Sequence, residues 1–290
     1  MVQRLLMASM ILFCVLVRAA SAQPVSIVAA ENFYGEVAQQ VAGDSATVSS
    51  IMSNPDQDPH LFEASPSVAR LLSAATIVVY NGADYDPWMA KLLSAARSPN
   101  RAVIVVADLV HRKPGDNPHL WYDPPTMPAF AKALTAVLSQ RDPAHKADYD
   151  QRLQAFLDSL QPLQAKIADI RANSHGFPVT ATEPVFGYMA TALSFKMRNE
   201  RFQLAVMNDT EPRVSDVAAF EDDLRKHRVR LLFYNSQATD AAAQRLVTIA
   251  QQSKVPVVGV TETEPPGKTY QQWMTDQLDA VAQAQANHPP

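Results

Sequence analysis

Thr76-Ile77-Val78-Val79-Tyr80 is a short run of β-branched and aromatic residues, and it decides the fold. A run that is apolar at every position is typical of a strand buried on both faces of a sheet. A helix is predicted before it, over 65–74, because Ser65-Pro66 supplies a polar cap and a proline at the first helical position. Another helix is predicted after it, over 84–96. This stretch therefore predicts a helix–strand–helix unit.

The same alternation continues in both directions along the chain. Further apolar strands are predicted at 25–30, 46–52, 102–107, 177–181, 229–234 and 255–260. Further helices are predicted at 32–41, 125–140, 184–193, 213–227, 239–253 and 269–286. Apolar strands that alternate with helices indicate an α/β fold, in which parallel sheets are flanked by helices on both faces.

An apolar stripe in the middle of the chain has a helical period. Its members are spaced alternately by four and three residues: Tyr149, Leu153, Phe156, Leu160, Leu163, Ile167 and Ile170. The stripe predicts one amphipathic helix over 143–172, about 45 Å long, and Pro162 favours a kink in it. A coiled-coil dimer would also explain the stripe, but about three heptads is the lower limit for that interpretation. We therefore expect packing within one chain, and a monomer.

The first residues have the features of a secretory signal peptide over 1–22. Arg4 supplies a positive start, 5–17 an apolar run, and Ala20-Ser21-Ala22 a small-residue cleavage site. The only cysteine, Cys14, follows Phe13, whereas lipid attachment requires a small residue there. We expect a secreted protein with a cleaved leader, whose mature chain has no disulfide, thiolate ligand or cysteine nucleophile.

The rest of the chain is predicted to form two α/β lobes, over 23–142 and 173–290, joined by the helix at 143–172. Without Arg4 and Arg18, the 25 basic residues fall to 23 against 29 acidic ones, a formal charge of −6. This charge gives no reason to expect nucleic acid or an anionic membrane surface as a partner. The sequence also lacks a phosphate-binding glycine loop, a Gly-x-Ser-x-Gly elbow and a His-Glu-x-x-His motif.

Two loops of the first lobe share a Pro-His-Leu-aromatic pattern. The first is Asp58-Pro59-His60-Leu61-Phe62, and the second lies within Asn117-Pro118-His119-Leu120-Trp121-Tyr122-Asp123-Pro124. Each precedes a helix-start signal. Proline fixes its own backbone and restricts the residue before it, so both imidazoles are held on short tethers that suit a preformed metal site.

In parallel α/β sheets, ligands bind just beyond the carboxyl ends of the strands. Four residues with metal-binding side chains follow predicted strands: His60, His119, Glu183 and Glu262. Two lie in each lobe, which would place a site in the cleft between the lobes.

These residues resemble the metal-binding receptors of bacterial ABC importers (cluster A-I), which capture zinc, manganese or iron(II). The resemblance rests on Asp58-Pro59-His60, on the Asn-Pro-His-Leu-Trp-x-Asp-Pro motif of 117–124, and on the helix at 143–172. It implies a periplasmic receptor that binds one divalent ion and delivers it to the membrane permease of an ABC importer.

The resemblance also implies which residues bind the metal. His60 and His119 take the first two ligand positions, and Glu183 takes the third, three residues before the Phe186-Gly187-Tyr188 frame. Glu262 takes the fourth, with Glu264 as its rival. Zinc receptors of the family usually have histidine at the third position, so two imidazoles and two carboxylates resemble the manganese and iron branch. Carboxylates suit Mn²⁺, but Zn²⁺ binds such sites more tightly, so both remain candidate cargoes.

Two other functions use the same residues. A metal-dependent hydrolase would need an open coordination position and a general base, for which Asp123 or Glu264 is the candidate. A surface adhesin of the same fold is the other alternative. Four protein ligands leave little room for an activated water, which favours a carrier without catalytic residues over an enzyme. Because imidazole must be neutral to bind metal, we expect affinity to fall as pH drops through its protonation range.

Overall fold

The structure is a computed structural model that describes residues 25–53, 62, 65–208, 210–237 and 241–286. The predicted signal peptide and His60 lie outside these residues. In the described part of the chain, no helix is both long and apolar enough to cross a membrane.

The first lobe contains a parallel sheet of four strands in the order β2-β1-β3-β4. The strands are β1 (Val25–Glu31), β2 (Ala46–Met52), β3 (Ile77–Tyr80) and β4 (Ala102–Val105). The helices are α1 (Asn32–Ala42), α2 (Pro66–Ala74), α3 (Pro87–Ala95), α4 (Val106–Leu109) and α5 (Thr126–Arg141). The strand predicted over 102–107 is too long, because its last two residues begin the short helix α4.

The second lobe repeats this plan with a parallel sheet in the order β6-β5-β7-β8. Its strands are β5 (Pro178–Ala181), β6 (Lys196–Arg198), β7 (Leu232–Asn235) and β8 (Val257–Val260). Its helices are α8 (Gly187–Ala192), α9 (Glu200–Met207), α10 (Val214–Arg225), α11 (Ala241–Gln252) and α12 (Tyr270–Ala286). The sequence did not predict β6, because Lys-Met-Arg is too short and polar to indicate a strand. It did not predict α9 either.

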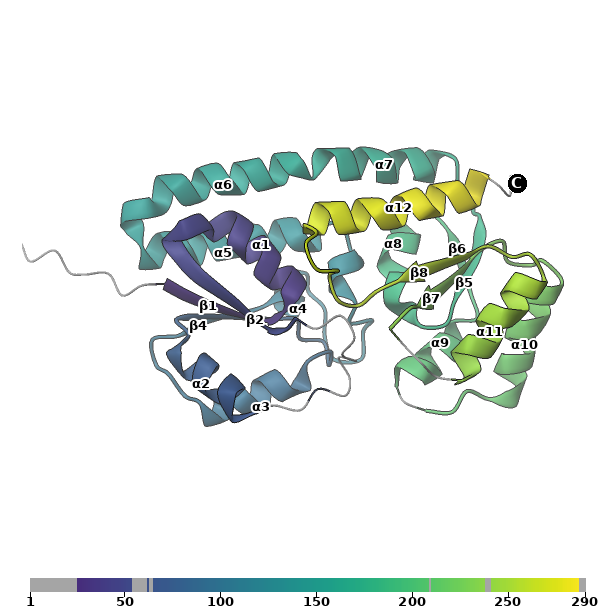
Figure 1. The fold of residues 1–290 in the computed structure, drawn as a ribbon, viewed down its shortest axis with the longest axis horizontal. Helices are drawn as coiled ribbons and strands as arrows, with labels where there is room; N and C mark the ends of the chain where they lie inside the picture. The colour runs from purple at the N-terminus through teal and green to yellow at the C-terminus, as the bar shows by residue number, and fades with distance from the viewer. Residues whose placement is uncertain (1–24, 54–61, 63–64, 209, 238–240, 287–290) are drawn as a thin grey trace, which may run out of the picture.

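The long linking helix is divided at Leu160 into α6 (Lys146–Ser159) and α7 (Gln161–Ala172). Pro162 explains the break, since it has no N–H to donate and is favoured only in the first turn of a helix. The two segments still run end to end along one side of the molecule (Figure 1). The sequence predicts one kinked helix, whereas the structure has two helices that meet at Leu160.

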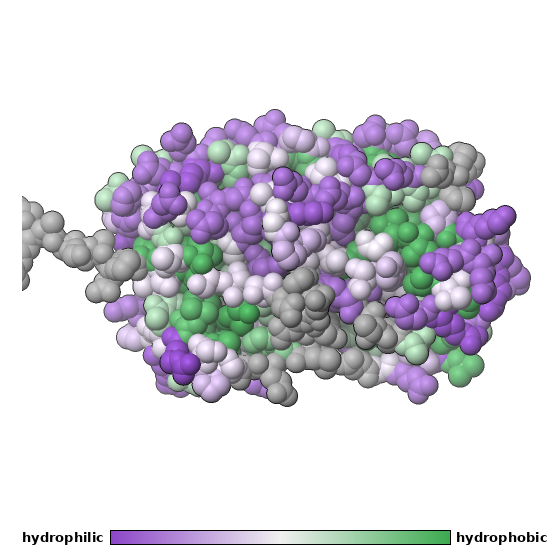
Figure 2. Space-filling view, viewed as in Figure 1, coloured by the Kyte–Doolittle hydropathy of each residue, from purple (hydrophilic) through white to green (hydrophobic). Residues whose placement is uncertain are grey.

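The apolar stripe on α6 and α7 faces inward, as predicted. Six of its members are buried, and Leu153 is partly buried against the same core. The outer side of these helices is largely hydrophilic (Figure 2). Packing within the chain therefore accounts for the stripe.

One hydrophobic core extends across both lobes. It contains Ile27 and Ile77 from the first sheet, Phe233 and Val260 from the second, and buried residues of α12. The opposite face of each sheet has its own smaller core, under α2 and α3 in the first lobe and under α10 and α11 in the second. Because α12 packs on α7, β8 and α1, the last helix of the chain joins the two lobes.

Candidate metal site

His119 lies at the boundary between the lobes and is completely buried. The Nδ1 atom of its ring is 2.6 Å from Oδ1 of Asn117, which also accepts a hydrogen bond from the His119 backbone N–H. The Asn117 amide is oriented by its other end, because Nδ2 donates to the Pro184 carbonyl. Oδ1 can only accept, so Nδ1 of His119 carries the proton. The lone pair is therefore on Nε2, which is where a metal would bind.

Glu262 approaches this nitrogen from the second lobe. Its Oε2 atom is 3.6 Å from Nε2 of His119, and both side chains are buried. The Tyr85 hydroxyl lies beside the same carboxylate, and burial, followed by the charge of Glu262, raises the pKa of Tyr85 well above its usual range. An imidazole nitrogen and a carboxylate oxygen thus meet across the lobe boundary, at the ends of two different sheets.

Glu183 is connected to Glu262 through Asn235, the last residue of β7. The Asn235 side-chain Nδ2 donates to Oε2 of Glu183 at 2.9 Å and to Oε1 of Glu262 at 2.7 Å. Glu183 and Glu262 each follow the end of a strand that pairs with β7. The structure therefore brings three of the predicted ligands to one place, two by direct contact and the third through an amide.

Glu264, the rival for the fourth position, has different neighbours. Its backbone N–H and carbonyl are both hydrogen-bonded to the Asn32 side chain at the start of α1. Burial, with the charge of Glu36 as a second cause, raises the pKa of the Glu264 carboxyl to about 9. Its described contacts are with α1 rather than with His119 or Asn235.

Hydrogen bonds between the lobes hold the site on more than one side. Tyr122 donates to the Thr261 carbonyl, and Tyr270 donates to the Trp121 carbonyl. Tyr188 donates to the Asn117 carbonyl. The loops that carry His119 and Glu262 are each tied to the opposite lobe.

Within the described residues, no group of three or more His, Cys, Asp or Glu side chains is arranged so that it could hold a metal ion. His60, the remaining predicted ligand, lies outside those residues. The described residues contribute one imidazole and two carboxylates, with the Asn235 amide between the carboxylates.

A family model described as the periplasmic component A of a zinc-uptake complex matches residues 27–284. The chain belongs to this family. The resemblance that the Pro-His motifs carried is thereby confirmed over almost the whole chain.

Curated relatives of this zinc-uptake family member cover nearly its full length. The manganese ABC transporter substrate-binding lipoprotein PsaA of Streptococcus mitis is 25% identical over 289 residues, covering 92% of this chain and 91% of the relative. The metal ABC transporter substrate-binding lipoprotein SloC of Streptococcus mutans is 24% identical over 278 residues, covering 89% of each protein.

Solved structures confirm the two-lobed α/β fold. The periplasmic zinc-binding protein TroA of Treponema pallidum superposes with a TM-score of 0.75 at 20% identity, covering 90% of this chain and 99% of that one. A manganese-bound periplasmic metal-binding protein of Candidatus Liberibacter asiaticus gives a TM-score of 0.72 at 18% identity, covering 89% and 98%. At sequence identities of 20% and 18%, these two structures show that the fold is shared.

Sequence reasoning missed Asn235 and Gln237. Gln237 Oε1 accepts the backbone N–H groups of Glu262 and Thr263, at 2.6 and 3.1 Å, and so fixes the turn that carries Glu262. A signal for Asn235 was present, because it directly follows the strand predicted at 229–234, between two strands that are followed by acids. The missing information was the strand order, which puts β7 between the other two.

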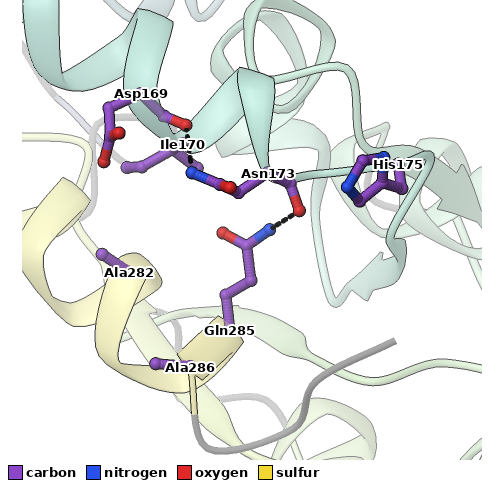
Figure 3. Close-up of a pocket in the computed structure, with 7 residues that line it drawn as sticks. All are labelled: Asp169, Ile170, Asn173, His175, Ala282, Gln285 and Ala286. Carbon is purple, nitrogen blue, oxygen red and sulfur yellow. Dashed lines mark hydrogen bonds between the residues drawn. The ribbon is translucent and has the colours of Figure 1, made fainter.

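A pocket of about 420 Å³ lies between the C-terminal ends of α7 and α12 (Figure 3). Its lining residues are Asp169, Ile170, Asn173, His175, Ala282, Gln285 and Ala286. Gln285 donates to the Asn173 carbonyl across the pocket. None of the predicted ligands lines it, so this pocket is separate from the candidate metal site.

Proposed function

We propose that this chain is an extracytoplasmic receptor for one divalent transition-metal ion. It would bind the ion between the lobes and deliver it to the permease of an ABC importer. The proposed ligands are neutral His60 and His119 with the carboxylates of Glu183 and Glu262. Zinc and manganese are the candidate cargoes, with iron(II) as a third.

One observation carries the proposal. Nε2 of His119 and Oε2 of Glu262 are buried and 3.6 Å apart, although they belong to different lobes. Burying ionisable groups costs free energy unless their charge is balanced and their polar atoms are hydrogen-bonded or bound to a metal. A divalent cation would accept the nitrogen lone pair and balance the carboxylate charge.

Family membership supports the transport role over the hydrolase and adhesin alternatives. The relatives named above are substrate-binding or metal-binding proteins, and none is named a hydrolase or an adhesin. Two are named lipoproteins, whereas Phe13 precedes Cys14 here. We infer a protein released into the periplasm after cleavage near residue 22, acting as a monomer without catalytic residues.

The test is a calorimetric titration of the chelator-stripped mature protein with Zn²⁺ and with Mn²⁺. Wild type should bind one ion, and His119→Ala should bind about 100-fold or more weakly, because a direct ligand is lost. His227→Asn is the matched control: His227 is exposed and has a left-handed backbone, which asparagine tolerates.

Two outcomes would overturn the proposal. One is that wild type binds neither metal, and the other is that His119→Ala binds both as tightly as wild type. If His227→Asn weakens metal binding as much as His119→Ala does, the loss of affinity is not specific to the proposed site.

A further inference from the structure

Asn235 occupies a strand end from which its side chain reaches both glutamates. In the sheet order β6-β5-β7-β8, its strand β7 lies between β5 and β8. Glu183 follows the end of β5, and Glu262 follows the end of β8. Asn235 is buried and pairs in register with Val260, at the end of β8. The fold therefore aims one short amide at two carboxylates that lie far apart in the sequence.

The orientation of this amide follows from its own hydrogen bonds. Oδ1 of Asn235 accepts the backbone N–H of Gln237 at 3.1 Å, so Nδ2 faces the glutamates. An amide nitrogen has two hydrogens, and each is directed to one carboxylate. The two donors are matched to two negatively charged acceptors, which gives charge-assisted bonds of defined geometry.

We propose that Asn235 is a positioning residue that sets the metal preference of this site. The inference rests on the function proposed above. Asn235 holds Oε2 of Glu183 and Oε1 of Glu262. Each carboxylate then turns its other oxygen to the metal and binds through that oxygen alone.

If each glutamate binds through one oxygen, the metal ion has a low coordination number. A carboxylate that binds through both oxygens adds a ligand atom, and such sites suit Mn²⁺, which favours six-coordinate oxygen-rich geometry. A carboxylate that binds through one oxygen suits the tetrahedral geometry of Zn²⁺. Asn235 thus favours Zn²⁺ over Mn²⁺ beyond the preference that the ligand types alone would give. Its amide also separates the two negative charges when no ion is bound.

The experiment compares wild type with Asn235→Ala and Asn235→Leu. Zn²⁺ and Mn²⁺ affinities are measured by competition titration, and coordination is followed by the visible absorption of the Co²⁺ complex. Four-coordinate Co²⁺ absorbs strongly and six-coordinate Co²⁺ weakly. Without the amide donor, the Zn²⁺-to-Mn²⁺ affinity ratio should fall about tenfold, and the Co²⁺ absorption should weaken. Asn235→Leu keeps the side-chain size without adding a charge or a ligand atom, and it protects the test against a cavity-related folding defect in the alanine variant.

Asn173→Ala is the matched control. The Asn173 amide also donates a hydrogen bond, to the Asp169 carbonyl, but it lines the pocket between α7 and α12, which contains none of the proposed ligands. This variant should change neither the affinity ratio nor the Co²⁺ spectrum.

The inference is overturned if the Asn235 variants weaken both metals equally, or not at all, with an unchanged Co²⁺ spectrum. That result would leave the proposed function intact, because wild type would still bind. Absence of metal binding by wild type would instead defeat the proposed function, and this inference with it.

Discussion

In the first lobe, His119 is held by a residue two positions before it in the chain, whereas in the second lobe Glu183 and Glu262 are held by Asn235, which is 52 and 27 residues away. The first arrangement is local and belongs to a recognisable motif. The second depends on three strands lying side by side. Local positioning can be read from a sequence, while positioning through a sheet requires the strand order.

The two glutamates that follow β8 give the sharpest test of the second lobe. Glu262→Gln should weaken Zn²⁺ and Mn²⁺ binding by about 100-fold or more, because it removes a carboxylate that faces His119. Glu264→Gln should leave affinity within about threefold of wild type, since its contacts are with α1. Titration calorimetry measures both variants, and each serves as the other's control. A large loss in Glu264→Gln with little change in Glu262→Gln would reverse the assignment.

The first lobe is tested through Asn117. Asn117→Ala should weaken metal binding by about 10–100-fold, because the Nδ1 proton of His119 loses its acceptor and the ring its fixed tautomer. Asn117→Asp retains an acceptor oxygen and should bind more tightly than the alanine variant. Competition titration with a chromophoric chelator resolves the two. Equal affinities of the alanine and aspartate variants would show that the acceptor is not what Asn117 contributes.

A buried acid pair outside the ligand set gives a smaller effect, on stability. Glu31 ends β1 and lies beside Asp86. Burial, and then the charge of Asp86, raise the pKa of Glu31 well above its usual range, while burial raises the pKa of Asp86 to about 6. The folded chain therefore keeps protons that the unfolded chain has already released. Its free energy of unfolding should fall as pH rises from about 5 through 6 and beyond.

Glu31→Gln removes one of these ionisable groups and keeps its shape. The fall in unfolding free energy between pH 5 and pH 8 should become smaller by roughly 1–3 kcal/mol. Urea denaturation at several pH values measures it. Glu200→Gln, at an exposed glutamate that begins α9, should leave the wild-type pH dependence unchanged. Parallel curves for wild type and Glu31→Gln would contradict the prediction.

The sequence alone determined the α/β class, the parallel sheets and most of the helices, because apolar period and helix caps are local properties. It also determined the family, through the Pro-His motifs and the residues around His119. The strand β6 and the helix break at Leu160 were not predicted, and both omissions also have local causes. A three-residue polar strand carries no periodic signal, and a stripe that continues past Pro162 conceals the break there.

Only the tertiary structure decided how the second lobe is arranged around His119. Glu262 and Glu264 are two positions apart, and nothing in their spacing says which of them faces an imidazole. The distinction comes from Asn32, which binds the backbone of Glu264, and from Gln237, which binds the backbone of Glu262. The role of Asn235 likewise appears only when β7 lies between β5 and β8. Contacts between residues far apart in the chain depend on strand order and side-chain direction, and those are properties of the folded molecule rather than of any local pattern.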